Sequence, residues 1–335
     1  MFQKRCFNFI WGRKLEPISR KTLYSHMLKG GLNVPNLELK IHSFYLCHIF
    51  KIINNYNTPW VEFAVYWTGL QLKKYNPSIA SNNIPHSEII PPFYVKCLSV
   101  FTDFVENCKS SVNSLWTVKE IYNYFIENMN IEPKCVRDCK SVDFNNSFKN
   151  VFSSAVDPEC RNTCFSIVHN ALLTNQYLFS RNMIRSSKCT FCSKPETIDH
   201  LFVECYISTS INKVVLFFMH VLTADNHKLS LKQFHYLNVD NSYDKEINYV
   251  FLILLSESRQ IIWRTRNDVK FDKKLFSPFD LICKLIYRLK YRILLDFKRF
   301  PSEKFELIWG NYCDVNANKK VELRLDLNPA IYANI

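Results

Sequence analysis

The chain lacks the motifs on which several large enzyme classes depend. Only five of its 335 residues are glycine, and none of them lies in a glycine-rich loop of the kind that cradles a phosphate. The sequence contains no Asp-Asp dipeptide, although paired aspartates hold the two metal ions of a polymerase. HExxH and GxSxG motifs are also missing. These absences predict that the chain has no catalytic residues and is not an enzyme by itself.

Long apolar runs are missing as well. The longest, residues 214–219 and 249–255, are far shorter than the ~20 residues that a membrane-spanning helix needs. The amino terminus carries Asn8, Arg13 and Lys14 where a secretory signal would have an apolar core. We therefore expect no membrane partner and an intracellular location, in the nucleus, the cytoplasm or both.

The sequence is rich in hydrophobic residues, positive charge and cysteine. A hydrophobic content of 47% and an aromatic content of 15% supply enough apolar surface for a folded protein, and we expect it to be mostly helical. The net charge of +13 indicates an acidic polymer as partner. Thirteen cysteines, an odd number, argue against a disulfide framework and leave buried thiols or metal ligands.

Capping residues predict several helix starts. Asp157 followed by Pro158 indicates the start of one helix, and Thr174 is expected to cap a short helix that ends at Phe179. A serine, a proline and, at the third position, an aspartate open a further predicted helix, which runs from residue 277 to about 300.

Apolar periodicity predicts two more helices. One covers residues 36–54 approximately. The other is a long amphipathic helix whose apolar positions between residues 247 and 262 recur at i, i+3, i+4 and i+7, so a partner helix must cover that stripe. Beyond Trp309 we expect a frayed tail.

Four residues have the spacing of a zinc site. Cys189 and Cys192 are separated by two residues, seven more lead to His200, and four more lead to Cys205. A C-x2-C turn lets two thiolates reach one ion, but residues at i and i+5 do not share a face of a regular helix. The helix that carries His200 must therefore end or loosen before Cys205. Four protein ligands leave no position for water, so we expect one structural Zn²⁺ ion.

A second set of cysteines leaves an alternative open. Cys135-x3-Cys139 and Cys160-x3-Cys164 could together form another four-cysteine site. The same i, i+4 spacing fits packing on helices, because cysteine is one of the most buried residue types.

Basic residues and aromatic rings alternate on the predicted helix at 277–300. Lys284, Arg288 and Arg292 lie at i, i+4 and i+8, beside Tyr287 and Tyr291. Cations next to stackable rings suit a phosphate backbone with unpaired bases, whereas the alternative is an ordinary solvated helix face. Further cations extend the positive region, namely Arg259, Arg264, Arg266, Lys270, Lys273 and Lys274, and a second group lies in the connector at Lys4, Arg5, Arg13, Lys14, Arg20 and Lys21.

Several segments resemble a known family. FIWG at residues 9–12, ISRKTL at 18–23 and KGGLNVPNL at 29–37 resemble the segment downstream of the polymerase region in LINE-type (non-LTR) retrotransposon reverse transcriptases. LLTN at 172–175 and ETIDHLF at 196–202, together with the four zinc-type ligands, resemble the reverse-transcriptase zinc-binding domain. IWRTRN at 262–267 is similar to the helix that follows it.

The resemblance implies a function. In this family one polypeptide nicks target DNA and copies element RNA, and its zinc knuckle contacts nucleic acid. We expect a non-catalytic, nucleic-acid-binding C-terminal part of a transposable-element reverse transcriptase, either truncated or a remnant. Its partners would be element RNA, target DNA and an upstream polymerase or endonuclease region. The alternatives are a fragment that is active only when joined to an upstream polymerase, and a helical interaction scaffold.

The expected fold is mainly α, with connector and bundle segments around the small zinc-binding domain. We predict a basic connector at 1–58, a helical middle segment at 59–150, the zinc-binding domain at 157–210, a basic helical segment at 211–312 and a flexible tail at 313–335. The predicted nucleic-acid contacts are Arg13, Arg20, Lys21, Arg264, Arg266, Lys284, Arg288, Arg292, Tyr287 and Tyr291.

Overall fold

The computed structural model is mainly helical, as the sequence predicts. It describes residues 2–12, 15–54, 58–80, 87–107, 116–140, 142–223, 236–238, 243–315 and 321–323. The chain divides into two compact units. Unit 1 comprises Met1–Leu15, Arg20–Ser25 and Leu32–Ile131, and unit 2 comprises Glu16–Ser19, His26–Gly31 and Glu132–Ile335. The five-segment division given above stays a prediction.

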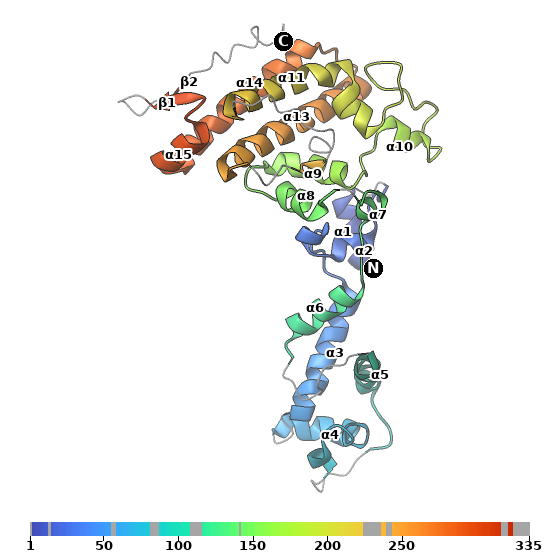
Figure 1. Ribbon diagram of the computed structural model, residues 1–335. Helices are drawn as coiled ribbons and strands as arrows, with labels where there is room; N and C mark the ends of the chain where they lie inside the picture. The colour runs from blue at the N-terminus through green and yellow to red at the C-terminus, as the bar shows by residue number, and fades with distance from the viewer. Residues whose placement is uncertain are drawn as a thin grey trace. The chain divides into compact units, whose positions relative to one another are not determined.

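Unit 1 is built around the long helix α3 (Leu37–Asn54), which confirms the helix expected at 36–54. Asn36 opens this helix, because its side-chain oxygen accepts hydrogen bonds from the backbone N–H groups of Glu38 and Leu39. The other elements are α1 (Phe2–Ile10), α2 (Arg20–Tyr24), α4 (Pro59–Leu72), η2 (Pro77–Ala80), α5 (Pro92–Asn107) and α6 (Val118–Asn128). Helices α4, α5 and α6 all pack against α3 (Figure 1).

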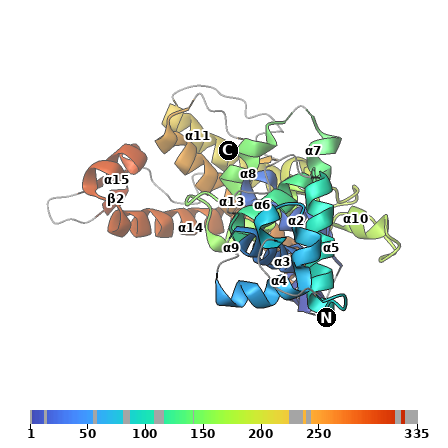
Figure 2. The ribbon, with the colours of Figure 1, turned by 90° about the horizontal axis from the view of Figure 1, so that it is seen from below.

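Unit 2 is a layered group of helices. Its elements are η1 (Met27–Lys29), α7 (Lys134–Asp138), α8 (Phe144–Val151), α9 (Pro158–Val168), α10 (Asn175–Phe179), η3 (His200–Glu204), α11 (Tyr206–Thr223), α13 (Lys245–Asp272), α14 (Pro278–Arg299) and α15 (Ser302–Trp309). Helices α11, α13 and α14 pack against one another, and α9 packs on α13. Helix α15 follows the end of α14 in both views (Figures 1 and 2).

The predicted helix starts in unit 2 are confirmed. Asp157 caps α9 with Pro158 in its first turn, and the Thr174 side chain caps α10. Ser277 and Asp280 form a reciprocal capping box at the start of α14. These local signals work because each cap binds backbone N–H groups that the helix itself leaves unpaired.

Helix α13 corrects the expectation of a single apolar stripe. Every residue from 250 to 262 is buried, including Ser256 and Gln260. The reason is tertiary, because α9, α11 and α14 all contact this helix. Its middle is therefore an interior helix of unit 2, whereas Arg264 near its carboxyl end is exposed.

Gly30 marks a close approach in unit 2. It follows η1 with φ of 79°, a left-handed conformation that favours glycine. A Cβ atom added there would lie 2.6 Å from the ring of Phe148 on α8. The glycine in the KGGL segment is thus required by both backbone conformation and space.

The tail differs in part from the expected frayed end. Residues Cys313–Val315 (β1) pair antiparallel with Val321–Leu323 (β2), and the rest of the predicted flexible tail lies outside the described residues. The described part of the chain contains no helix with the length and hydrophobicity of a membrane span.

Candidate metal centre

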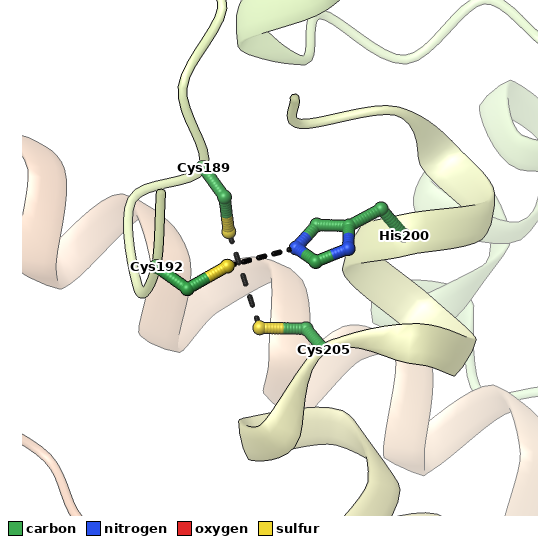
Figure 3. Close-up of side chains that lie close together, drawn as sticks. All are labelled: Cys189, Cys192, His200 and Cys205. Atoms are coloured by element: carbon green, nitrogen blue, oxygen red, sulfur yellow. Dashed lines mark hydrogen bonds between the residues drawn. The ribbon is translucent and has the colours of Figure 1, made fainter. Parts of the chain in front are cut away.

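The Cys189-x2-Cys192 turn sits in a small hairpin of unit 2. Lys188 and Pro195 form an antiparallel bridge, and the Cys189 N–H donates to the Lys194 carbonyl at 2.7 Å. The Phe191 N–H donates to the Cys189 Sγ at 3.4 Å. The hairpin therefore directs the two thiols of the turn to the same side (Figure 3).

The other two residues are brought together by a π-helical turn. Helix η3 (His200–Glu204) has π geometry, and the Cys205 N–H donates to the His200 carbonyl at 2.7 Å. Such an i to i+5 turn puts the first and sixth residues on one side. Cys205 itself is extended and ends the turn. The prediction that the helix loosens before Cys205 is confirmed.

The four side chains converge on one point (Figure 3). Their ligand atoms all lie within 4.8 Å of one another. The Cys192 Sγ is 3.2 Å from the His200 Nε2, and the Cys189 Sγ is 4.0 Å from the Cys205 Sγ. A tetrahedral zinc ion with ordinary bond lengths separates two sulfur ligands by about 3.8 Å and a sulfur from a nitrogen by about 3.6 Å. Donor chemistry and spacing both fit zinc.

Neighbouring groups of the cluster influence one another. Contact with Cys205 raises the pKa of Cys189, and the same contact lowers the pKa of Cys205, so one proton leaves the pair more easily than from an ordinary thiol. Among the residues that the structure describes, the buried Nδ1 of His200 has no hydrogen-bond partner, but it lies 3.6 Å from a carboxylate oxygen of Glu204. A ligating histidine commonly directs its other ring nitrogen to such a group.

The alternative four-cysteine site is not assembled. Within the described ranges, the four residues of the Cys189 cluster are the one group of three or more candidate metal ligands that lie together. Cys160 is buried beside Glu257, and burial, the largest cause, raises its pKa. Cys135 instead approaches the Nδ1 of His169 at 3.7 Å. Cys135, Cys160 and Cys164 are buried and serve as packing residues.

The predicted nucleic-acid contacts on α14 are mostly engaged within the protein. Arg288 donates to Glu257 at 3.0 Å and to Glu159 at 3.1 Å. Arg292 donates to the buried Asp296 at 3.2 Å, and only 12% of its side chain is exposed. Both guanidinium groups therefore neutralise carboxylates of unit 2.

The aromatic residues of α14 are placed differently. Tyr287 and Tyr291 are 72% and 58% exposed and line a cleft of about 400 Å³. Glu159 and Glu257 line the same cleft, so it is partly acidic. Lys284 is half-buried, with its ammonium group 3.9 Å from the centre of the Phe276 ring.

The two predicted contacts on α13 have opposite environments. Arg264 has a half-exposed side chain and pairs with Glu159 at 3.2 Å. Arg266 is only 1% exposed and binds the buried carboxylate of Glu196. Arg266 thus has no exposed surface to offer a phosphate.

The predicted contacts in the connector lie in unit 1 where they are described. Arg20 and Lys21 are exposed on α2, and the Arg20 guanidinium lies 4.7 Å from the centre of the Phe7 ring. Arg13 lies outside the described residues.

A basic loop beside the metal cluster was missed by the sequence reasoning. We define it by four exposed residues between α10 and η3: Arg181, Arg185, Lys188 and Lys194. In the part of the chain that the structure describes, no carboxylate lies within ion-pair distance of any of them. The available signal was the complete lack of Asp and Glu between residues 160 and 195.

Comparison with known families agrees with the geometry. Residues 116–211 match the family described as zinc-binding in reverse transcriptase. The matched segment is under a third of the 335-residue chain and contains all four residues of the cluster. No curated protein matches the chain. The predicted resemblance to the zinc-binding region of reverse transcriptases is confirmed, while the match does not distinguish the LINE type.

Proposed function

We propose that this chain is a non-catalytic, nucleic-acid-binding C-terminal region of a LINE-type reverse transcriptase. One structural Zn²⁺ held by Cys189, Cys192, His200 and Cys205 would organise the binding surface. The observation that carries the proposal is the basic loop, whose four cations are exposed on the segment that leads into and through the Cys189-x2-Cys192 turn and form no ion pair with any described residue. Its intracellular setting would supply both nucleic acid and reduced thiols.

The zinc ion would act through the chain that it holds. A four-ligand site without an open position stabilises a fold and does not activate water. Here Cys189 and Cys192 lie in the hairpin that also carries Lys188 and Lys194. Fixing these thiols to His200 and Cys205 would restrain the hairpin, and with it the spacing of the charges that it presents.

The basic loop has the chemistry of a single-strand binding surface. Cations that are not paired with a carboxylate of the protein can neutralise phosphates without first breaking an ion pair. Phe179 and Met183, which are 43% and 54% exposed, lie in the same stretch of the chain, and an exposed ring can stack on an unpaired base. These features favour single-stranded RNA, or an RNA and DNA junction, as partner.

Helix α14 has a secondary part in this proposal. Its cleft is lined by Glu159, Glu257 and Asp157 as well as by arginines that already bind carboxylates, so a phosphate gains little there. Tyr287 and Tyr291 remain exposed and can stack on bases.

The test is the salt dependence of binding. Each cation that neutralises a phosphate of a single strand contributes about −0.7 to the slope of log affinity against log salt concentration, because counterions are released. We expect the metal-loaded chain to bind a short single-stranded RNA, and the variant with Arg181, Arg185, Lys188 and Lys194 all changed to Ala to bind more weakly. Its slope should be flatter by about two to three.

The control removes the same charge elsewhere on unit 2. Lys134, Arg137, Lys149 and Lys298 are all exposed, and changing these four to Ala should alter the slope much less. Equal effects of the two quadruple variants would mean that binding follows net charge alone. No binding by the wild-type chain at low salt would overturn the proposal and favour a helical scaffold.

A further inference from the structure

A buried carboxylate connects the metal cluster to the interior of unit 2. Glu196 follows the cysteine hairpin and is 0% exposed. Its Oε2 accepts hydrogen bonds from the Thr190 N–H at 3.0 Å and the Thr190 hydroxyl at 2.8 Å. Its Oε1 accepts from the Asn175 N–H at 2.8 Å and from two nitrogens of Arg266, at 3.1 Å for Nε and 2.5 Å for Nη2. Five donors thus bind one side chain.

The contacts with Thr190 connect Glu196 to the turn that carries two of the metal-cluster residues. Thr190 lies between Cys189 and Cys192, so the two hydrogen bonds to Glu196 fix the peptide that sets the direction of both thiols. Backbone hydrogen bonds hold the two arms of the hairpin together, and the contacts with Glu196 join the turn between the cysteines to the interior of unit 2. The thiols are weak hydrogen-bonding groups and add little to this before a metal binds.

Arg266 holds the carboxylate in turn. It lies on the interior helix α13, is 1% exposed, and also donates to the side chain of Asn175 at 2.9 Å. Asn175 receives a further hydrogen bond from Lys270 and donates to the Lys188 carbonyl at 2.7 Å. The start of α10, the cysteine hairpin and α13 are therefore tied together by one network.

A buried pair of this kind is costly to leave incomplete. Each charge loses its hydration on burial and depends on its partner and on hydrogen bonds to replace it. Burial by itself raises the pKa of Glu196, but the hydrogen bonds and charge of Arg266 outweigh that effect and hold the pKa below its usual value. Glu196 is accordingly a carboxylate, and it accepts all five hydrogen bonds in that form.

We propose that Glu196, locked in place by Arg266, is the positioning residue of the metal centre and holds the Cys189-x2-Cys192 turn in its metal-binding conformation before the ion arrives. The proposal rests on the zinc site proposed above. A site that is preformed binds its ion more tightly, because the apparent affinity is proportional to the fraction of molecules in the binding-competent conformation. Metal binding and the attachment of the hairpin to α13 then stabilise each other equally.

The variants Arg266→Met and Glu196→Gln test this directly. Zinc affinity is measured on the full chain by competition with a chelator of known affinity. Loss of an outer partner of a metal site costs about 10–100-fold in affinity, and we expect a loss in that range for both variants. Cobalt bound at saturation should give the wild-type thiolate absorption spectrum, because the ligands themselves are unchanged.

A matched control separates positioning from general stability. Arg288 also forms ion pairs in unit 2, with Glu159 and Glu257, but makes no contact with the hairpin among the described hydrogen bonds. Arg288→Met should lower the melting temperature while the zinc affinity stays as in the wild type. A purely structural role for Arg266 would likewise lower the melting temperature of the zinc-free and zinc-bound forms equally.

A milder variant decides the question if the buried charge variants do not fold. Thr190→Val removes the hydroxyl contact at 2.8 Å to Glu196 and keeps the size of the side chain. It should lower zinc affinity several-fold in a folded chain. Unchanged affinity in Thr190→Val or in folded Arg266→Met would overturn the positioning role and leave the zinc site intact. A wild-type chain that binds no zinc would instead overturn the zinc site itself.

Discussion

Three arginines of unit 2, Arg181, Arg266 and Arg292, occupy different environments, and each environment determines what the side chain can bind. Arg266 is interior, Arg292 is bound to Asp296 at the edge of α14, and Arg181 is exposed without a carboxylate partner among the described residues. All three side chains carry the same positive charge. Only the positions of distant carboxylates distinguish them, and these positions depend on the folded chain.

Arg292 is expected to contribute to stability and not to binding. It donates to Asp296 at 3.2 Å, to the Tyr249 hydroxyl at 2.5 Å and to the Ser154 carbonyl at 3.1 Å. Arg292→Ala leaves the buried Asp296 with less compensation, so we expect the free energy of unfolding to fall by about 3 kcal/mol. Urea denaturation measures this, and the salt slope of RNA binding should stay unchanged.

Arg181→Ala is the companion variant with the opposite expectation. Loss of an exposed side chain should change stability by less than about 0.5 kcal/mol, while the salt slope flattens by about 0.7. If Arg292→Ala flattened the slope and left the unfolding curve in place, α14 would be the phosphate-binding surface after all.

Elements that depend on local signals were predicted well from the sequence. Asp157, Thr174 and Ser277 cap the helices assigned to them, because a cap and its N–H partners lie within a few residues of each other. The four metal-cluster residues were also found from spacing alone, and so was the interruption of the helix before Cys205.

Features that depend on distant residues could not be predicted in the same way. Arg288 reaches Glu159, which is 129 positions away, and Glu257, which is 31 positions away. The i, i+4 pattern of cations on α14 predicts a surface that faces solvent. In the folded chain, two of these cations form ion pairs instead. The complete burial of the middle of α13 likewise results from three helices packing around it.

The variant Gly30→Ala tests the close contact between the end of η1 and α8. Gly30→Ala adds a methyl group to a residue with φ of 79°, at a point 2.6 Å from the Phe148 ring. Backbone strain of about 1 kcal/mol and overpacking of about 1–3 kcal/mol should both lower the free energy of unfolding, measured by urea denaturation.

Gly12→Ala is the control that measures backbone strain without overpacking. Gly12 has φ of 58°, but no described atom lies within 4 Å of an added Cβ, so only the strain of about 1 kcal/mol is expected. Equal losses in the two variants would mean that the Phe148 ring moves aside and that the close approach is not needed.

Unit 2 combines helices that pack around an apolar interior with a segment that carries the metal cluster. Apolar packing between α11, α13 and α14 supplies its interior, while the segment with the cysteine hairpin depends on Glu196, Arg266 and the proposed zinc ion. A structural zinc site contributes on the order of 10 kcal/mol of apparent folding energy in small domains. Losing the ion should therefore loosen residues 157–210 more than the helices of the interior.

The zinc content of the full chain, purified under reducing conditions, tests the proposed metal site. We expect one zinc ion per chain, and we expect Cys192→Ser to lose it and to expose residues 157–210 to limited proteolysis. Cys160→Ser is the control, because Cys160 is buried outside the cluster, and it should keep its zinc. A folded wild-type chain without stoichiometric zinc would overturn the zinc site and the functions proposed from it.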